Sequence, residues 1–132
     1  MGNAPETSVQ SLKSYGYYIG MAFQIMDDVL DFEGDSDHIG KPVGSDLANG
    51  VLTLPSIRVL EDYPANNPVS KWFSDTRDPE QLKLALEMIM NSDAIENCYG
   101  VIQEHCAKAQ ASLRDLPRGP SRESLSLLTE YI

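Results

Sequence analysis

The sequence contains few cysteines, and this shortage limits the kind of protein it can be. Two of the 132 residues are cysteine, and they do not form a CxxC pair. Cys98 and Cys106 are expected on one helix, about 12 Å apart along its axis, which is too far for a disulfide. This cysteine usage predicts a reducing, cytoplasmic setting.

Long apolar runs and basic residues are also scarce. No run approaches the roughly 20 residues that a membrane-spanning helix needs. The first ten residues, MGNAPETSVQ, lack the basic and apolar regions of a secretion signal. Ten basic residues stand against 20 acidic ones, for a net charge of −10. This balance argues against nucleic-acid binding and leaves room for cations, or for anionic ligands that a metal bridges.

The composition is that of one soluble globular domain. Hydrophobic residues make up 42% of the chain and charged residues 23%. A chain of this size buries roughly two-thirds of its unfolded surface. We therefore expect a single helical domain over residues 1–132.

Apolar periodicity and capping signals predict an all-α fold, and strand-like alternation of useful length is absent. Helices are expected over residues 8–33, 54–62, 69–73 and 79–90, over about 20 residues after Asp93, and from Ser121 onward. Residues 34–52 contain four glycines and are expected to form a mostly irregular loop.

Caps and buried faces can be assigned to several of these helices. Thr53, Asp78 and Ser121 each precede or begin a helix and are expected to cap it. For the helix after Thr53, the expected apolar face is Leu54, Ile57 and Leu60. For the helix after Asp93, it is Ile95, Cys98, Ile102, Cys106, Ala109 and Leu113. For the last helix, it is Leu125, Leu128 and Ile132.

The first helix has one apolar face and one polar face. Within an arc of about 120° on a helical wheel lie Ile19, Ala22, Phe23, Met26, Val29 and Leu30, which we expect to be buried. On the opposite side lie Gln24, Asp27, Asp28 and Asp31.

The three aspartates indicate a metal site. Residues 27–37 contain six acids and no base, and like charges at i and i+4 destabilise a helix by a few tenths of a kcal/mol. A hard divalent cation is the natural compensation, and Mg²⁺ commonly binds one or two carboxylates together with substrate phosphates. The alternative is a solvated acidic face, which is less expected on a helix whose other face is so apolar.

The loop segment Gly40-Lys41-Pro42-Val43-Gly44-Ser45-Asp46 offers a possible phosphate contact. A lysine on a glycine-rich loop can approach a phosphate as a point charge. The segment is not a Walker A loop, because five residues separate Gly34 from Gly40 and a proline follows Lys41. The acids over 31–37 do not have the register of an EF-hand either. Taken alone, Lys41 is more readily explained as an ordinary surface lysine.

Taken together, these segments resemble the trans-polyprenyl diphosphate synthases. The resemblance rests on Gly20-x-Ala22-Phe23-Gln24-Ile25-x-Asp27-Asp28-x-Leu30-Asp31, on Gly40-Lys41-x-x-Gly44-x-Asp46-Leu47 and on Thr53-Leu54-Pro55. They are similar to the second aspartate-rich motif of that family and its downstream loop. The resemblance implies a bundle of mostly antiparallel helices around a deep cavity, of which this chain would form the C-terminal half.

The resemblance also implies roles for individual residues. Asp27, Asp28 and Asp31 would hold Mg²⁺, and Lys41 would contact an allylic diphosphate. Phe23 and Gln24 would line the site beside the isopentenyl and allylic groups, and Asp46 would orient the loop or the lysine. Asp27, Asp28 and Lys41 would serve catalysis, in which isopentenyl diphosphate condenses with the allylic diphosphate.

Two departures from the family pattern bear on function. Some members carry a second lysine where this chain has Val51. The first aspartate-rich motif and the basic residues that bind isopentenyl diphosphate have no counterpart here, so the isolated chain is expected to be inactive. The alternative is a non-catalytic helical module, or a subunit that completes a site with a partner chain. Exposed apolar helix faces are expected to promote association, including homo-oligomers.

Overall fold

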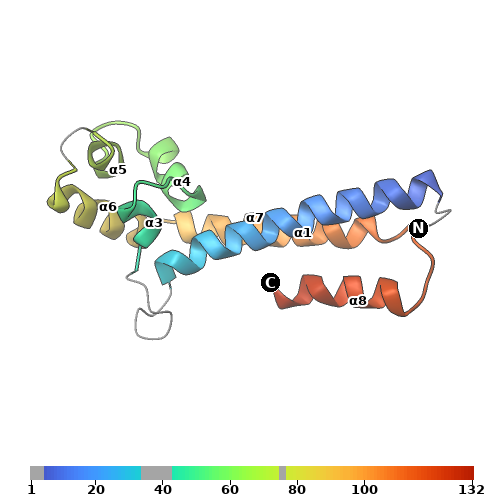
Figure 1. Ribbon diagram of the computed structural model, residues 1–132. Coiled ribbons are helices and arrows are strands. Elements are labelled where there is room, and N and C mark those ends of the chain that lie inside the picture. The colour runs from blue at the N-terminus through green and yellow to red at the C-terminus, as the bar shows by residue number, and fades with distance from the viewer. Residues whose placement is uncertain (1–4, 34–42, 75–76) are drawn as a thin grey trace. The chain divides into compact units, whose positions relative to one another are not determined.

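The fold is helical, as the sequence predicts. The computed structural model describes residues 5–33, 43–74 and 77–132, and no strand occurs among them. The α-helices are α1 (Glu6–Glu33), α3 (Ser45–Ala48), α4 (Leu54–Asp62), α5 (Pro68–Trp72), α6 (Pro79–Asn91), α7 (Ala94–Ser112) and α8 (Pro120–Leu128), and a 3₁₀ helix covers Thr129–Tyr131 (Figure 1). None of the described helices is long and apolar enough to cross a membrane.

Capping explains where several helices begin. The Asp78 side chain accepts a hydrogen bond from the Glu80 N–H at 3.0 Å and caps α6, as predicted. The Asn67 side chain caps α5 in the same way, by accepting from the Val69 N–H at 2.8 Å. Thr53 lies at the N-cap position of α4, but its hydroxyl makes no capping bond. Asp and Asn caps of this kind each contribute about 1 kcal/mol.

The last helix begins differently from the prediction. Gly119, rather than Ser121, occupies the N-cap position of α8, and no side chain caps the helix. Pro120 follows at the first helical position, where its missing N–H costs nothing. The proline therefore sets the start of α8 two residues before the position expected from Ser121.

The chain divides into two compact units, residues 1–24 with 100–132 and residues 25–99. The core of the first unit packs Tyr15 and Ile19 of α1 against Ala109 of α7 and against Leu113, which directly follows α7. Leu125 of α8 packs against this cluster, and its carbonyl accepts a 2.7 Å hydrogen bond from the Tyr15 hydroxyl. Both an apolar contact and a polar contact thus attach α8 to its unit.

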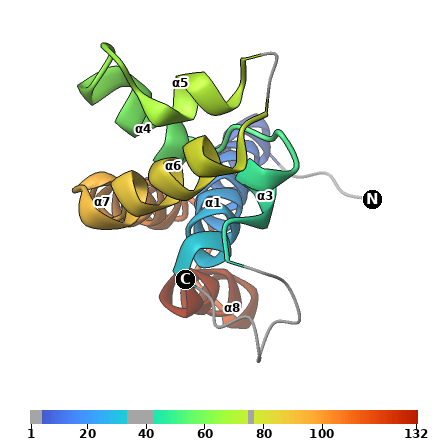
Figure 2. The same ribbon diagram turned by 90° about the vertical axis from the view of Figure 1, so that its left-hand side faces the viewer.

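The second unit gathers the short helices. Helices α4, α5 and α6 contact one another and lie together in Figure 2. Trp72 of α5 donates a buried 2.7 Å hydrogen bond from its indole N–H to the carbonyl of Leu47 in α3. Fully buried side chains here include Phe32, Leu47, Val59, Val69 and Ile89.

The predicted buried face of α1 is wrong in part. Ile19, Ala22 and Val29 are buried as expected, but Phe23 and Leu30 are 46% and 44% exposed. The buried residues of α1 are Tyr15, Ile19, Ala22, Ile25, Val29 and Phe32, with Ser8 near the helix start. From Tyr15 onward they recur in steps of three or four, so the buried seam drifts by about 20° per heptad around a wheel of 3.6 residues per turn. A fixed arc therefore misses Ile25 and Phe32.

The other predicted faces differ in accuracy. In α4 the face of Leu54, Ile57 and Leu60 is wrong, because the buried residues are Pro55, Ser56 and Val59. In α7 the predicted face is confirmed, with Ile95, Cys98, Ile102, Ala109 and Leu113 buried and Cys106 half-buried. In the last segment Leu125 and Ile132 are partly buried, whereas Leu128 is 43% exposed. Both cysteines are free thiols.

Candidate functional site

The predicted acidic face lies on the last turns of α1. Asp27 is exposed, while Asp28 and Asp31 are half-buried. No basic residue occupies the last turn of this helix. The partial negative charge at a helix C-terminus disfavours carboxylates there, and the aspartates also repel one another. This end of α1 therefore concentrates negative charge, which a cation would neutralise.

Asp31 holds the chain segment that follows the aspartate motif. Its Oδ1 accepts a 2.8 Å hydrogen bond from the Ser45 hydroxyl, and its Oδ2 accepts from the Asp46 N–H at 3.2 Å. Its main-chain carbonyl accepts from the Gly44 N–H at 2.8 Å. Gly44, the N-cap of α3, has φ of 75° and no side chain to offer. Asp31 therefore caps α3 from a different helix, an arrangement that we call the Asp31 clamp.

A further hydrogen bond, from a different helix, holds the end of α1. The Tyr99 hydroxyl of α7 donates to the Glu33 carboxylate at 2.5 Å. This hydrogen bond, with smaller contributions from burial and from the Glu33 charge, raises the pKa of Tyr99 to about 12. Tyr99 therefore stays protonated and donating at neutral pH. Together with the Asp31 clamp, it anchors the helix end that presents the aspartates.

The electrostatics of the acidic face extend into the core of the second unit. Burial raises the pKa of the Cys98 thiol to about 11; Arg58 opposes this shift and the Asp28 charge adds to it. Mg²⁺ takes oxygen ligands, whereas the buried Cys98 thiol is a soft donor that suits other metals. The oxygen atoms of the aspartates are the relevant donors.

The other predicted site residues lie in different settings. Phe23 and Gln24 are exposed one turn before Asp27 on α1. Asp46 is half-buried in the first turn of α3. Lys41 lies outside the described residues, so its contact with a diphosphate stays a prediction. Val51, at the position of the second family lysine, is half exposed.

The aspartates fit Mg²⁺ as part of a site rather than as a complete one. Carboxylate oxygens are the ligands that Mg²⁺ prefers, and the ion commonly keeps several waters and takes only one or two carboxylates. Within the described residues, no group of three acidic, histidine or cysteine side chains is arranged to hold a metal ion. Asp31 already accepts two hydrogen bonds. The exposed Asp27 is therefore a better candidate for a direct ligand than Asp31.

Ser45 and Tyr99 were not among the predicted site residues. Ser45 lies inside the quoted loop motif, but its partner is 14 positions away in sequence, and the partner of Tyr99 is 66 away. Periodicity and capping rules act over one or two helical turns, so they carry no signal for such pairs. The nearest available hint was the abundance of acids near residue 31.

Comparison with known proteins identifies relatives of the chain. The family model described as polyprenyl synthetase matches residues 1–89. The heptaprenyl diphosphate synthase component 2 of Bacillus subtilis is 40% identical over 129 residues, covering 98% of this chain and 37% of that protein. A prenyl transferase of Synechocystis is 35% identical and matches the whole chain but 40% of its own length.

Solved structures agree with the sequence matches. The heptaprenyl diphosphate synthase from Staphylococcus aureus superposes with a TM-score of 0.85 at 36% identity, over 96% of this chain and 40% of that one. A polyprenyl synthase from Caulobacter crescentus, solved with calcium and isoprenyl diphosphate, gives 0.79 at 26% identity, over 97% of this chain and 40% of that one. The chain thus spans about 40% of the length of these relatives.

Proposed function

Because the chain belongs to the polyprenyl synthetase family, we propose that it is the part of a polyprenyl diphosphate synthase that carries one half of a Mg²⁺–diphosphate site. The whole protein would condense isopentenyl diphosphate with an allylic diphosphate. The observation that carries the proposal is the acidic end of α1, where Asp27 and Asp28 lie beside the Asp31 clamp. The matches to named synthases support it.

The chain's own residues would bind the metal, position the loop and contact the diphosphate. Asp27 and Asp28 would hold Mg²⁺, which when bound neutralises charge that develops on the departing diphosphate. Asp31 would keep the Gly44–Asp46 segment against α1 and so fix the point where the loop that contains Lys41 ends. Lys41 would contact the allylic diphosphate.

Phe23 and Gln24 would complete the substrate contacts from the same helix. Phe23 presents an exposed aromatic ring one turn before Asp27, which suits the apolar prenyl groups. Gln24 offers an amide that donates and accepts hydrogen bonds. Asp46 would act through its position in α3, by orienting the loop or the lysine.

An assay of prenyl transfer tests the half-site proposal. Purified chain, radiolabelled isopentenyl diphosphate, an allylic primer and Mg²⁺ should give no product, because the chain lacks a counterpart of the first aspartate-rich motif. Clear product formation by the chain alone would refute the half-site. In the complete synthase, Asp27→Ala or Asp28→Ala should lower kcat much more than Gln24→Ala or Asp46→Ala.

The sign of the kinetic effects follows from charge. Diphosphate gains negative charge as it leaves, so a cation that Asp27 and Asp28 hold would stabilise the transition state more than the ground state. Lys41→Ala should raise the KM for the allylic substrate and also lower kcat, because its charge serves both states. Equal kcat losses for Asp28→Ala and Gln24→Ala would count against this assignment.

A second candidate function is that of a subunit that completes its site with a partner chain. The Bacillus relatives are named as component 2 of a heptaprenyl diphosphate synthase, and a fission-yeast relative is named as a subunit of a decaprenyl synthase. Exposed apolar residues on α1, among them Leu12 and Phe23, offer a surface for association. Sedimentation with and without the candidate partner separates the two functions. Only the subunit function predicts a stable complex between the chain and that partner.

A further inference from the structure

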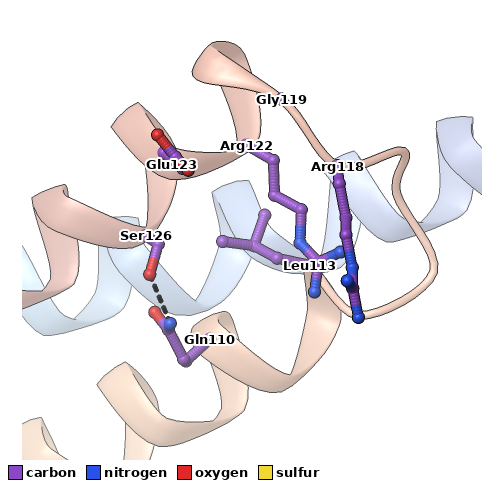
Figure 3. Close-up of a pocket in the computed structure, with 7 residues that line it drawn as sticks. All are labelled: Gln110, Leu113, Arg118, Gly119, Arg122, Glu123 and Ser126. Atoms are coloured by element: carbon purple, nitrogen blue, oxygen red, sulfur yellow. Dashed lines mark hydrogen bonds between the residues drawn. The ribbon is translucent and has the colours of Figure 1, made fainter.

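Two adjacent pockets in the first unit share the same pair of arginines. One pocket, of about 280 Å³, is lined mostly by polar residues, among them Glu123 and Ser126 (Figure 3). The other, of about 340 Å³, has a mostly apolar lining that includes Leu12. Arg118 and Arg122 line both pockets. A polar cavity and an apolar cavity therefore meet at two positive charges.

The two arginines can pair with an anionic ligand. In Figure 3 both side chains extend toward Leu113 at the same end of the polar pocket, while Glu123 lies away from them. Among the described residues, the ion pairs join Arg58 to Glu61 and Lys108 to Glu104, and neither involves Arg118 or Arg122.

The hydrogen bonds of this region leave most guanidinium donors available. One Nη of half-buried Arg122 donates to the Leu116 carbonyl at 3.2 Å, which holds the side chain at the pocket. A guanidinium has five N–H donors in a fork that matches phosphate oxygens. Gln110 donates to the Ser126 hydroxyl, as the dashed line in Figure 3 marks. The polar pocket therefore offers a preorganised arginine, a second exposed arginine and an amide.

The apolar pocket fits a short hydrocarbon chain. Its carbon lining comes from Leu12, Leu116, Pro117, Pro120 and Leu125. Leu12 lies on α1 and is 45% exposed, so this wall is open to a ligand. An anionic head at the arginines would leave its tail directly beside these side chains.

We propose that this pair of pockets binds a soluble, single-chain phosphorylated amphiphile, with the phosphate head at Arg118 and Arg122 and the apolar tail against Leu12 and Leu116. The proposal stands on the pockets and not on the function proposed for the aspartates of α1. The site differs from the acidic face in charge, since it would hold a phosphate without any metal.

Three probes in phosphate-free buffer without divalent cations test the site. They are inorganic phosphate for the head, 1-hexanol for the tail and hexyl phosphate for both. Binding of each probe is measured from the NMR shifts of the arginine Nε–H groups and the Leu12 methyls. Without divalent cations the aspartates repel phosphate, so they contribute no binding. Hexyl phosphate should bind at least about tenfold more tightly than inorganic phosphate, because each buried methylene contributes about fourfold.

Matched variants assign the binding to these residues. Arg118→Gln should weaken hexyl phosphate and inorganic phosphate alike, whereas Arg114→Gln, which removes the same charge from an exposed arginine outside both pockets, should weaken neither. Leu12→Ala should weaken hexyl phosphate alone, and Leu127→Ala, at an exposed leucine outside the pockets, should have no effect.

Several results would overturn the proposal. Equal affinities for phosphate and hexyl phosphate would mean an ion site without a tail pocket. Equal losses in Arg118→Gln and Arg114→Gln would mean diffuse attraction to positive charge. Binding to phosphatidic acid vesicles but not to hexyl phosphate would mean a membrane-surface contact. Because Arg122 also bonds to Leu116, the exposed Arg118 carries the decisive test.

Discussion

Removing the Asp31 side chain should make the segment that follows the aspartate motif easier to unfold. Asp31→Ala eliminates the two side-chain hydrogen bonds of the Asp31 clamp, from the Ser45 hydroxyl and the Asp46 N–H. Helix-capping side chains contribute about 0.5 to 2 kcal/mol, and hydrogen bonds to charged groups lie in a similar range. The gain in helix propensity from Asp to Ala offsets a few tenths of a kcal/mol. We expect a net loss of about 1 kcal/mol in the free energy of unfolding.

Asp27→Ala is the matched control. It removes the same charge from the same helix, one turn earlier, at an exposed side chain. The variant gains the same helix propensity and relieves the like-charge repulsion with Asp31 at i+4, which is worth a few tenths of a kcal/mol. The free energy of unfolding should therefore stay constant or rise. The difference between the two variants measures the clamp alone.

Tryptophan fluorescence during urea unfolding is the appropriate assay. Trp72 is the only tryptophan, and its indole N–H donates to Leu47 in α3, so its emission reports on the clamped segment. Hydrogen exchange of the Asp46 amide should accelerate in Asp31→Ala and in Ser45→Ala. Equal stabilities of Asp31→Ala and Asp27→Ala, with unchanged exchange at Asp46, would refute the clamp.

Two further outcomes follow from the second unit. Gly44→Ala should destabilise the protein by about 2 kcal/mol, because φ of 75° disfavours a side chain and the new Cβ would collide with Leu86; urea unfolding measures this. The raised pKa of Tyr99 favours the folded state below the ordinary value of 10.0, and this contribution should be lost as pH rises toward about 12. Tyr99→Phe should remove that alkaline component from a pH series of unfolding free energies, and an unchanged profile would contradict the Glu33 bond.

The sequence predicts the helices of this chain well because their signals are local. Asp78 followed by Pro79 fixes the start of α6, and the apolar stripe of α7 from Ile95 to Leu113 is confirmed. These features depend on residues within one turn of each other. Helix α5 was placed within one residue of its observed start, although its Asn67 cap was not foreseen.

What the sequence could not supply is which faces of α1 and α4 are buried. Phe23 and Leu30 are as apolar as Val29, yet they are exposed, because the buried seam of α1 follows steps of three and four residues rather than a fixed arc. In the site, the aspartates could be placed on one helical face from spacing alone. The difference in role between the exposed Asp27 and the hydrogen-bonded Asp31 depends on Ser45. No local rule pairs Ser45 with residue 31.

The central claim, that this chain carries half of a Mg²⁺–diphosphate site, is tested most directly by calorimetric titration with Mg²⁺. Two carboxylates and water give a weak site, so the chain should bind Mg²⁺ with a Kd of about 1 mM or weaker, and the heat should disappear in the Asp27→Ala, Asp28→Ala double variant. Micromolar binding without diphosphate would show a self-sufficient metal site and contradict the account.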